Sequence, residues 1–380
     1  MAQWLWRSTG IAGLTLLAFL GTGCSGEPAA PSCPDWVQWQ DFRTVFLSED
    51  GRVIDRGSPD SRTVSEGQAY ALLFALAAND RAAFDRILAW TEANLADGDL
   101  TARLPAWLWG RNDQGEWGVI DANAASDADT WMAYALIEAG RLWQAPRYAA
   151  LGRLLADRVR REAVADLPDL GPTLLPAPAG FQPGPDRWRL NPSYLPVPLL
   201  RRLAAVNPDW TPVIASARAV ITRSAVGDFA PDWTAYGAET GFGPDPEHGT
   251  HGDYDAIRVY LWAGMMDRAD PLRNDLLEAL PGMARAAAAN GQPPEKVADG
   301  DVVRAVGPPG FSAAVLPYLS ALGRDELVEQ QRLRLEAQPI PDDSYYQRVL
   351  GLFGQGWQDR WLRFDRDGRL QVRWEPACGA

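Results

Sequence analysis

Two short segments place carboxylates directly before apolar, helix-like sequence. Asp127 and Asp129 lie in the run ASDADTWMAYALIEAGRLW at 125–143, and Glu66 precedes the run AYALLFALAAN at 69–79. Cleavage of a glycosidic bond takes one carboxyl group that donates a proton and a second that acts as a base. Carboxylates gathered at the starts of packed helices are therefore candidates for this chemistry.

Acidic residues in first turns also have a simpler explanation. The patterns S-x-x-Q at 65–68 and S-x-x-D at 126–129 fit capping boxes, and a negative charge there suits the helix dipole. A general acid must keep its proton near neutral pH, so burial or a neighbouring carboxylate has to raise its pKa. The catalytic interpretation therefore requires Glu66 and Asp127 to lie close together.

A third acid occurs in the segment GDYDAIRVYLW at 252–262. Asp255, Arg258 and Trp262 are spaced i, i+3 and i+7, on one face of a helix. An Asp–Arg pair on the protein surface is the alternative. Because Val259 and an aromatic residue share this face, we expect the pair to point inward.

Composition limits the function classes. The 380 residues are 47% hydrophobic and 22% charged, with a net charge of −13, which predicts a soluble globular protein with a large core and disfavours nucleic-acid binding. A neutral substrate fits better, and some of the 17 tryptophans are expected to stack on sugar rings. Three cysteines, with His248 and His251 in a Gly-rich loop, give little material for a zinc site or a His-dependent triad, so we expect no metal and no cofactor.

The N-terminus has the features of an export signal. Arg7 precedes an apolar run at 11–20 that is too short to span a bilayer, so residues 1–23 are expected to be a signal peptide. Cys24 resembles the lipidated residue of a bacterial lipoprotein, although Gly21 is unusual three places before it, and ordinary cleavage is the alternative. We expect an exported, periplasmic protein, anchored to the outer membrane if Cys24 carries lipid.

The two other cysteines lie near the ends of the mature chain. Export would place Cys33 and Cys378 in an oxidising compartment, where a disulfide would tie the termini together. Two free thiols are the alternative. Residues 24–34, rich in Pro, Ser and Ala, are expected to form a tether to one domain over 35–380.

Helical periodicity dominates that domain. Apolar residues recur at three and four places in twelve segments: 35–47, 68–79, 81–95, 129–144, 147–162, 194–206, 210–224, 255–266, 272–290, 312–322, 326–338 and 344–355. Strand pairs are expected only at 100–120 and 361–374. Long Gly/Pro/Trp-rich loops at 167–190 and 227–252 are expected to carry function. The pattern predicts an all-α domain, a double ring of about twelve helices with small peripheral hairpins.

These segments together resemble glycoside hydrolase family 8, and within it the endoglucanases of bacterial cellulose-synthesis operons. Family-like motifs cover nearly the whole chain after the signal: GRVID, SEGQAY, RLPAWLWG, ASDADTW, NPSYLP, YDAIRVYLW, PPEK, GFSAAVLP and LFGQGW. Cys24 departs from the plain signal peptide common in that group. Asp253 stands where small hydroxyl residues are familiar, and we give it no role.

The resemblance implies an (α/α)6 barrel that hydrolyses internal β-1,4-glucosidic bonds of cellulose with inversion. It implies that Glu66 is the proton donor and Asp255 the base, while Asp127 holds the distorted sugar. Some descriptions of the family call the Asp127 position a nucleophile, but an inverting route has no covalent intermediate. Five further side chains are expected to line the groove: Tyr194, Trp107, Trp109, Trp131 and Arg258.

The expected partners are a β-1,4-glucan chain and the cellulose-synthase export machinery. Three other functions are alternatives. A non-catalytic glucan-binding protein would not need all three acids. A lyase or epimerase on a similar toroid uses His, Tyr or Arg around its sugar, and histidine is scarce here. Cleavage of chitosan or xylan also occurs among family 8 enzymes.

Overall fold

The computed structural model describes residues 35–375. The signal, Cys24, Cys33 and Cys378 lie outside these residues, so the expected lipidation and disulfide are not described by it. Within the described part, no helix is long and apolar enough to cross a membrane.

Six inner helices form a ring. They are α2 (Ser65–Ala77), α4 (Ser126–Leu142), α6 (Val197–Val206), α8 (Ala256–Met265), α11 (Pro309–Ala321) and α13 (Tyr345–Gln358). Most of their residues are buried, and α2, α4, α8 and α11 are buried on nearly every face. Each contacts the next, in this order, around the ring. Phe74 of α2 packs edge-on against Phe353 of α13, with ring centroids 4.7 Å apart, and closes it.

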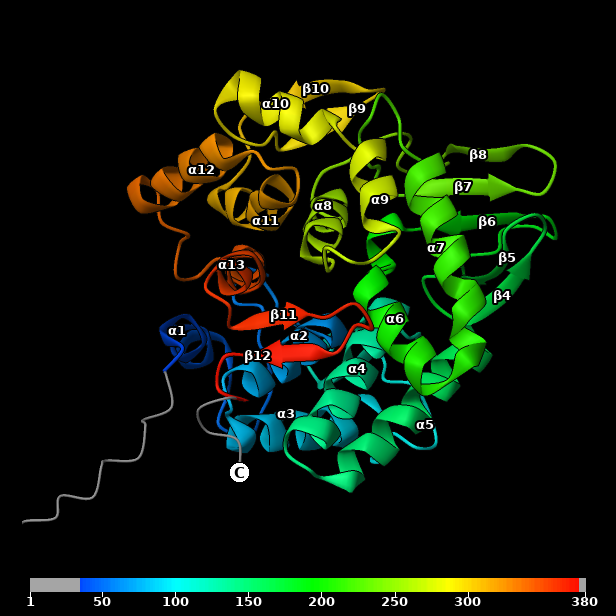
Figure 1. The fold of residues 1–380 in the computed structure, drawn as a ribbon. Coiled ribbons are helices and arrows are strands. Elements are labelled where there is room, and N and C mark those ends of the chain that lie inside the picture. Colours follow the sequence, from blue (N-terminus) through cyan, green and yellow to red (C-terminus); the bar gives the residue numbers. More distant parts are fainter. Residues whose placement is uncertain (1–34, 376–380) are drawn as a thin grey trace, which may run out of the picture. The chain divides into compact units, whose positions relative to one another are not determined.

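Seven outer helices surround the ring (Figure 1). They are α1 (Val37–Phe46), α3 (Arg81–Leu95), α5 (Pro146–Ala163), α7 (Thr211–Arg223), α9 (Arg273–Ala279), α10 (Gly282–Asn290) and α12 (Asp325–Ala337). They bury one face each, and α3, α5, α7, α9 and α12 each pack on the inner helix that precedes them. This is the predicted (α/α)6 barrel. The single helix expected at 272–290 is wrong: it is two helices, α9 and α10, because Pro281 lacks the N–H needed to continue a helix.

Glycines bring the backbones of inner helices into direct contact. Gly264 of α8 lies against the main chain of Tyr318 in α11, and Gly354 of α13 lies against the main chain of Ala313 in α11. A Cβ atom at either glycine would overlap these backbone atoms. Only glycine allows this approach, which holds three neighbouring helices of the ring at short distances.

Five small antiparallel sheets decorate the barrel. They pair β1 (Thr63–Val64) with β2 (Leu108–Arg111) and β3 (Trp117–Asp121); β4 (Val164–Leu167) with β5 (Gly171–Leu174); β6 (Arg187–Leu190) with β7 (Thr234–Gly237) and β8 (Gly241–Pro244); β9 (Lys296–Ala298) with β10 (Asp301–Arg304); and β11 (Leu362–Phe364) with β12 (Leu370–Val372). The expected pairs at 100–120 and 361–374 are confirmed by β2–β3 and β11–β12. The other three sheets were not predicted.

The two capping boxes are absent. Ser65 and Ser126 are the first residues of their helices, and neither hydroxyl has a hydrogen-bond partner among the described residues. Instead, the Gln68 carboxamide accepts the Val53 N–H at 2.6 Å and donates to Thr91 Oγ1 at 2.8 Å. Gln68 therefore fastens α2 to the preceding loop and to α3.

Candidate active site

The three predicted acids lie at the starts of inner helices. Glu66 and Asp127 are the second residues of α2 and α4, and Asp255 immediately precedes α8. Each outer helix returns the chain to the end of the barrel where the next inner helix begins. The fold therefore gathers at one end three side chains that are up to 189 positions apart, the interval between Glu66 and Asp255.

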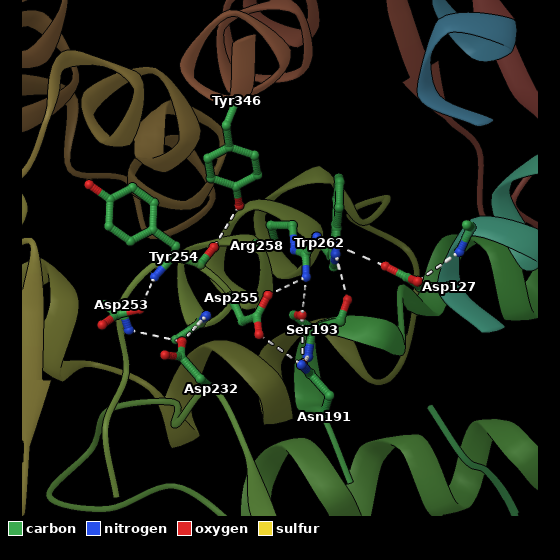
Figure 2. Close-up of polar contacts among 12 residues, drawn as sticks. Asp127, Asn191, Ser193, Asp232, Asp253, Tyr254, Asp255, Arg258, Trp262 and Tyr346 are labelled. Carbon is green, nitrogen blue, oxygen red and sulfur yellow. Dashed lines mark hydrogen bonds and ion pairs between the residues drawn. The ribbon is translucent and has the colours of Figure 1, made fainter. Parts of the chain in front are cut away.

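The Arg258 guanidinium joins two of these acids (Figure 2). Its Nη2 donates to Asp255 Oδ1 at 2.7 Å and to Ser193 Oγ at 2.9 Å, and its Nη1 lies 3.9 Å from Asp127 Oδ2. Arg258 is buried, so the predicted inward orientation of the Asp255–Arg258 pair is confirmed. One positive charge thus lies among three carboxylates, since it also acts on Glu66.

Burial and mutual repulsion favour protons on Glu66 and Asp127. Burial raises the pKa of Glu66, against the opposing effect of its backbone hydrogen bond and Arg258. Burial and the Glu66 charge raise the pKa of Asp127 to about 8. One oxygen of each, Glu66 Oε2 and Asp127 Oδ2, is buried without a hydrogen-bond partner among the described residues. Such atoms are expected to meet a ligand or water.

Asp255 is oriented from two sides yet remains accessible. Asn191 Nδ2 donates to Asp255 Oδ2 at 3.0 Å, opposite the Arg258 bond to the other oxygen. Asn191 also accepts the Ser193 hydroxyl at 2.7 Å, and Trp262 Nε1 donates to the Ser193 carbonyl at 3.0 Å. The Asp255 side chain is still 33% exposed, which leaves room for a reacting water. Asn191 and Ser193 were not predicted, although both lie in the quoted motif NPSYLP.

A buried acid that was also missed, Asp232, supports the start of α8. Its Oδ1 accepts the N–H groups of Asp253 at 2.8 Å and of Ala256 at 2.7 Å, on either side of Asp255 (Figure 2). Burial, with the nearby Asp255 charge, raises the pKa of Asp232 to about 8. The neighbouring Asp253 forms an ion pair with Lys296, whose Nζ lies 3.6 Å from Asp253 Oδ2. Asp232 fixes the backbone that carries Asp255.

An aromatic cleft of about 280 Å³ extends from Glu66. Trp107 and Tyr194 line it, where groove residues were expected. Two further aromatic residues, Phe181 and Trp233, also line it and stack with ring centroids 5.5 Å apart. They lie in the loops 167–190 and 227–252, whose composition was the one signal that pointed to them.

Two of the predicted groove tryptophans do not line this cleft, and the predicted Arg258 binds the acids instead. Trp131 is 1% exposed, and its ring packs among those of Trp262 and Phe353 in the core, so its expected place in the groove is wrong. Trp109 packs against Trp90 and Trp117 on the β2–β3 hairpin. Tryptophan packs against apolar surface both in a core and in the wall of a cleft. The sequence therefore does not show which of the two environments a given tryptophan occupies.

No group of three or more His, Cys, Asp or Glu side chains in residues 35–375 is arranged to hold a metal ion. His248 lies in the loop as expected, with its side chain 46% exposed. Its Nδ1 is 3.1 Å from Asp245 Oδ1, and its ring stacks on Trp233 with centroids 5.9 Å apart. This histidine therefore supports the aromatic wall of the cleft.

Comparison with known proteins agrees with this geometry. The family model "Glycosyl hydrolases family 8" matches residues 16–360. The chain is 49% identical over 363 residues to an endoglucanase of Xanthomonas axonopodis pv. citri (strain 306), covering 93% of each protein, and 45% identical over 347 residues to one of Escherichia coli (strain K12), covering 90% of this chain and 92% of that protein.

Solved structures give the same result. A crystal structure of an endo-1,4-D-glucanase from Vibrio fischeri ES114 superposes with a TM-score of 0.82 at 40% identity, covering 90% of this chain and 99% of that chain. Fold, site and similarity define a carbohydrate-cleaving enzyme, a glycoside hydrolase. The chain belongs to glycosyl hydrolase family 8, which confirms the resemblance found in its sequence motifs.

Proposed function

We propose that this protein is an endo-β-1,4-glucanase that hydrolyses internal bonds of cellulose with inversion at the anomeric carbon. The observation that carries the proposal is the convergence of Glu66, Asp127 and Asp255 around one guanidinium, beside an aromatic cleft. Relatives of 42–49% identity that bear the name endoglucanase support the substrate class.

Glu66 is the proton donor in this proposal. Burial raises its pKa, which favours the protonated carboxyl group that can pass its proton to the glycosidic oxygen. Its partnerless Oε2 is the atom left free for the substrate. As the C–O bond breaks, the departing sugar leaves as an alcohol and Glu66 becomes a carboxylate.

Asp255 is the base, and it takes a proton from the attacking water. Arg258 and Asn191 each hold one of its oxygens, so the carboxylate has a fixed direction toward the sugar. In an inverting enzyme this water attacks the face opposite the departing oxygen, which requires acid and base about 6.5–9.5 Å apart.

Asp127 holds the sugar at the cleavage point. Its Oδ1 accepts the Ala128 N–H at 2.8 Å, while its buried Oδ2 has no hydrogen-bond partner and is free to bind a sugar hydroxyl. A hydrogen bond from this carboxyl group to a ring hydroxyl can strengthen as the sugar approaches its distorted, oxocarbenium-like transition state. The flat faces of Trp107, Tyr194 and Trp233 suit the apolar faces of neutral glucose units.

The decisive experiment compares the full chain with its Glu66→Gln and Asp255→Asn variants on carboxymethylcellulose. Each substitution keeps the shape but removes proton transfer, so release of reducing ends should fall by about 10²–10⁴. Anomer-resolved NMR of the wild-type products should show the α-anomer first. Wild-type rates in either variant would refute the roles; β-anomer products would refute inversion.

A panel of chitosan and xylan in the same assay tests the substrate class. Faster cleavage of either polymer than of soluble cellulose would reassign the specificity within the family. Binding of cellulose without any hydrolysis would instead support the non-catalytic alternative.

We also propose that the enzyme is exported to the periplasm and works beside the cellulose-synthase export machinery, with a lipid on Cys24 and a Cys33–Cys378 disulfide. These proposals rest on the N-terminal sequence and on the resemblance alone. Mass spectrometry of the mature N-terminal peptide would identify a lipidated Cys24. Peptide mapping without reductant would detect the bridge, and two free thiols would contradict it.

A further inference from the structure

A cluster of arginines lies at the opposite end of the barrel from the catalytic acids. Asp255 precedes the first residue of α8 and Met265 is the last, so these ends are about 15 Å apart. Around Met265 and the end of α11 at Ala321 is a hollow of about 430 Å³. A second hollow of about 570 Å³ shares Arg360, Arg363 and Gln371 with it.

We call these two connected hollows together the arginine hollow. Five arginines line it: Arg268, Arg273, Arg360, Arg363 and Arg373. Within residues 35–375, none of the five has a carboxylate partner within 4.0 Å. Asp267 and Asp359 also line the hollows, but neither forms an ion pair there. Five arginines without carboxylate partners among the described residues therefore lie together in a chain whose net charge is −13.

The C-terminal ends of nearby helices offset part of this positive charge. The hollow receives the C-terminal ends of α8, α11 and α13, each equivalent to about half a negative charge, and Arg273 Nη2 donates to the Ala321 carbonyl at 3.1 Å. Three such ends together with two carboxylates still fall short of five guanidinium charges. The excess positive charge remains available to a ligand.

The arginines repel one another and are incompletely hydrogen-bonded. Burial and the charge of Arg360 lower the pKa of Arg363 to about 10, and burial and Arg268 lower that of Arg273. The Nε atoms of Arg363 and Arg273 are buried without partners among the described residues. The Arg363 guanidinium lies 3.4 Å from the centroid of the Trp357 ring, which orients its plane. A bound oxyanion would reduce the repulsion and supply acceptors.

We propose that the arginine hollow is a binding site for a phosphate group, carried either by a soluble di- or oligophosphate or by an anionic lipid headgroup. A multiply charged group with several oxygens suits a set of planar guanidinium donors better than a single carboxylate does. The apolar side chains of Met265, Phe364 and Val372 at the walls would accept an uncharged part of the same molecule. This site does not depend on the proposed glucanase function.

The test compares the full chain with the double variant Arg360→Gln/Arg363→Gln. The control, Arg161→Gln/Arg332→Gln, removes the same charge from exposed positions on α5 and α12. Isothermal titration with inorganic pyrophosphate measures binding of the soluble ligand. Co-sedimentation with phosphatidylglycerol vesicles, against phosphatidylcholine vesicles, measures binding of the lipid headgroup. Activity on carboxymethylcellulose, expected to be unchanged in both variants, reports that the barrel is intact.

We expect the wild type and the control to bind at least one probe, and the Arg360/Arg363 variant to lose about tenfold or more in affinity. Binding of pyrophosphate alone identifies a soluble phosphate ligand, and binding of phosphatidylglycerol vesicles alone identifies a lipid. No binding of either probe by the wild type, or an equal loss in both double variants, would overturn the proposal.

Discussion

Replacing Asp127 by asparagine should stabilise the protein while inactivating it. In the unfolded chain this carboxyl group loses its proton near its ordinary pKa of 3.8, whereas burial raises its pKa in the fold to about 8. Between these values the folded state keeps a proton that the unfolded state has released. The free energy of unfolding therefore falls as pH rises through this window.

The pKa shift sets the magnitude. Integrated from pH 4 to pH 7, it corresponds to about 4 kcal/mol of lost stability. Because the Glu66 charge contributes to the shift, we expect asparagine to recover about 2 to 4 kcal/mol. The asparagine side-chain oxygen can still accept the Ala128 N–H. For a domain of this size the gain corresponds to about 3 to 6 °C in melting temperature.

Thermal unfolding of wild type and Asp127→Asn at pH 4 and pH 7.5 checks this reasoning. The two proteins should melt at similar temperatures at pH 4, and the variant should melt higher at pH 7.5 with little activity left. Asp113→Asn, in the exposed β2–β3 turn, is the control and should show no such pH dependence. A variant that melts below wild type at pH 7.5, or a gap equal at both pH values, would refute the electrostatic account.

Three further predictions concern a residue that supports Asp255, a residue of the cleft wall and a contact between inner helices. Asp232→Ala removes the acceptor for two N–H groups beside Asp255, so kcat should fall by about 10-fold or more. Asp232→Asn keeps an acceptor oxygen and should keep most of the activity. Equal loss of activity in both variants would contradict a positioning role. Trp233→Ala removes one cleft wall and should raise KM for cello-oligosaccharides by about tenfold, with kcat little changed in steady-state assays. Gly354→Ala should cost about 1 to 3 kcal/mol or more in denaturant unfolding, against no loss for Gly118→Ala, whose Cβ would meet open space.

Much of the fold follows from local sequence. Four inner helices, α2, α4, α8 and α11, are buried on nearly every face, whereas the outer helices bury one face, and this contrast indicates two layers of helices. Closure of the ring depends on contacts between distant segments, such as Phe74 with Phe353, which no local pattern reveals. The break at Pro281 was visible in the sequence, but helical periodicity on both sides of it outweighed it.

The site was predicted less completely than the fold. The three acids and Arg258 could be found because each precedes or begins a strongly apolar helix in a recognisable motif. Phe181, Trp233 and Asp232 lie in loops, where side-chain periodicity carries no information. Trp131 was misplaced because its helix is buried on all faces, so an aromatic residue there has no preferred direction toward solvent.

The backbone contacts at Gly264 and Gly354 restrict how α8, α11 and α13 can move relative to one another. Helices whose backbones touch have no side chains between them that could rearrange, so this part of the ring is stiff. During turnover the compliant partner is then the polysaccharide, which must pucker and advance between fixed groups. We expect the movement that the protein contributes to come mainly from the two long loops that carry Phe181 and Trp233.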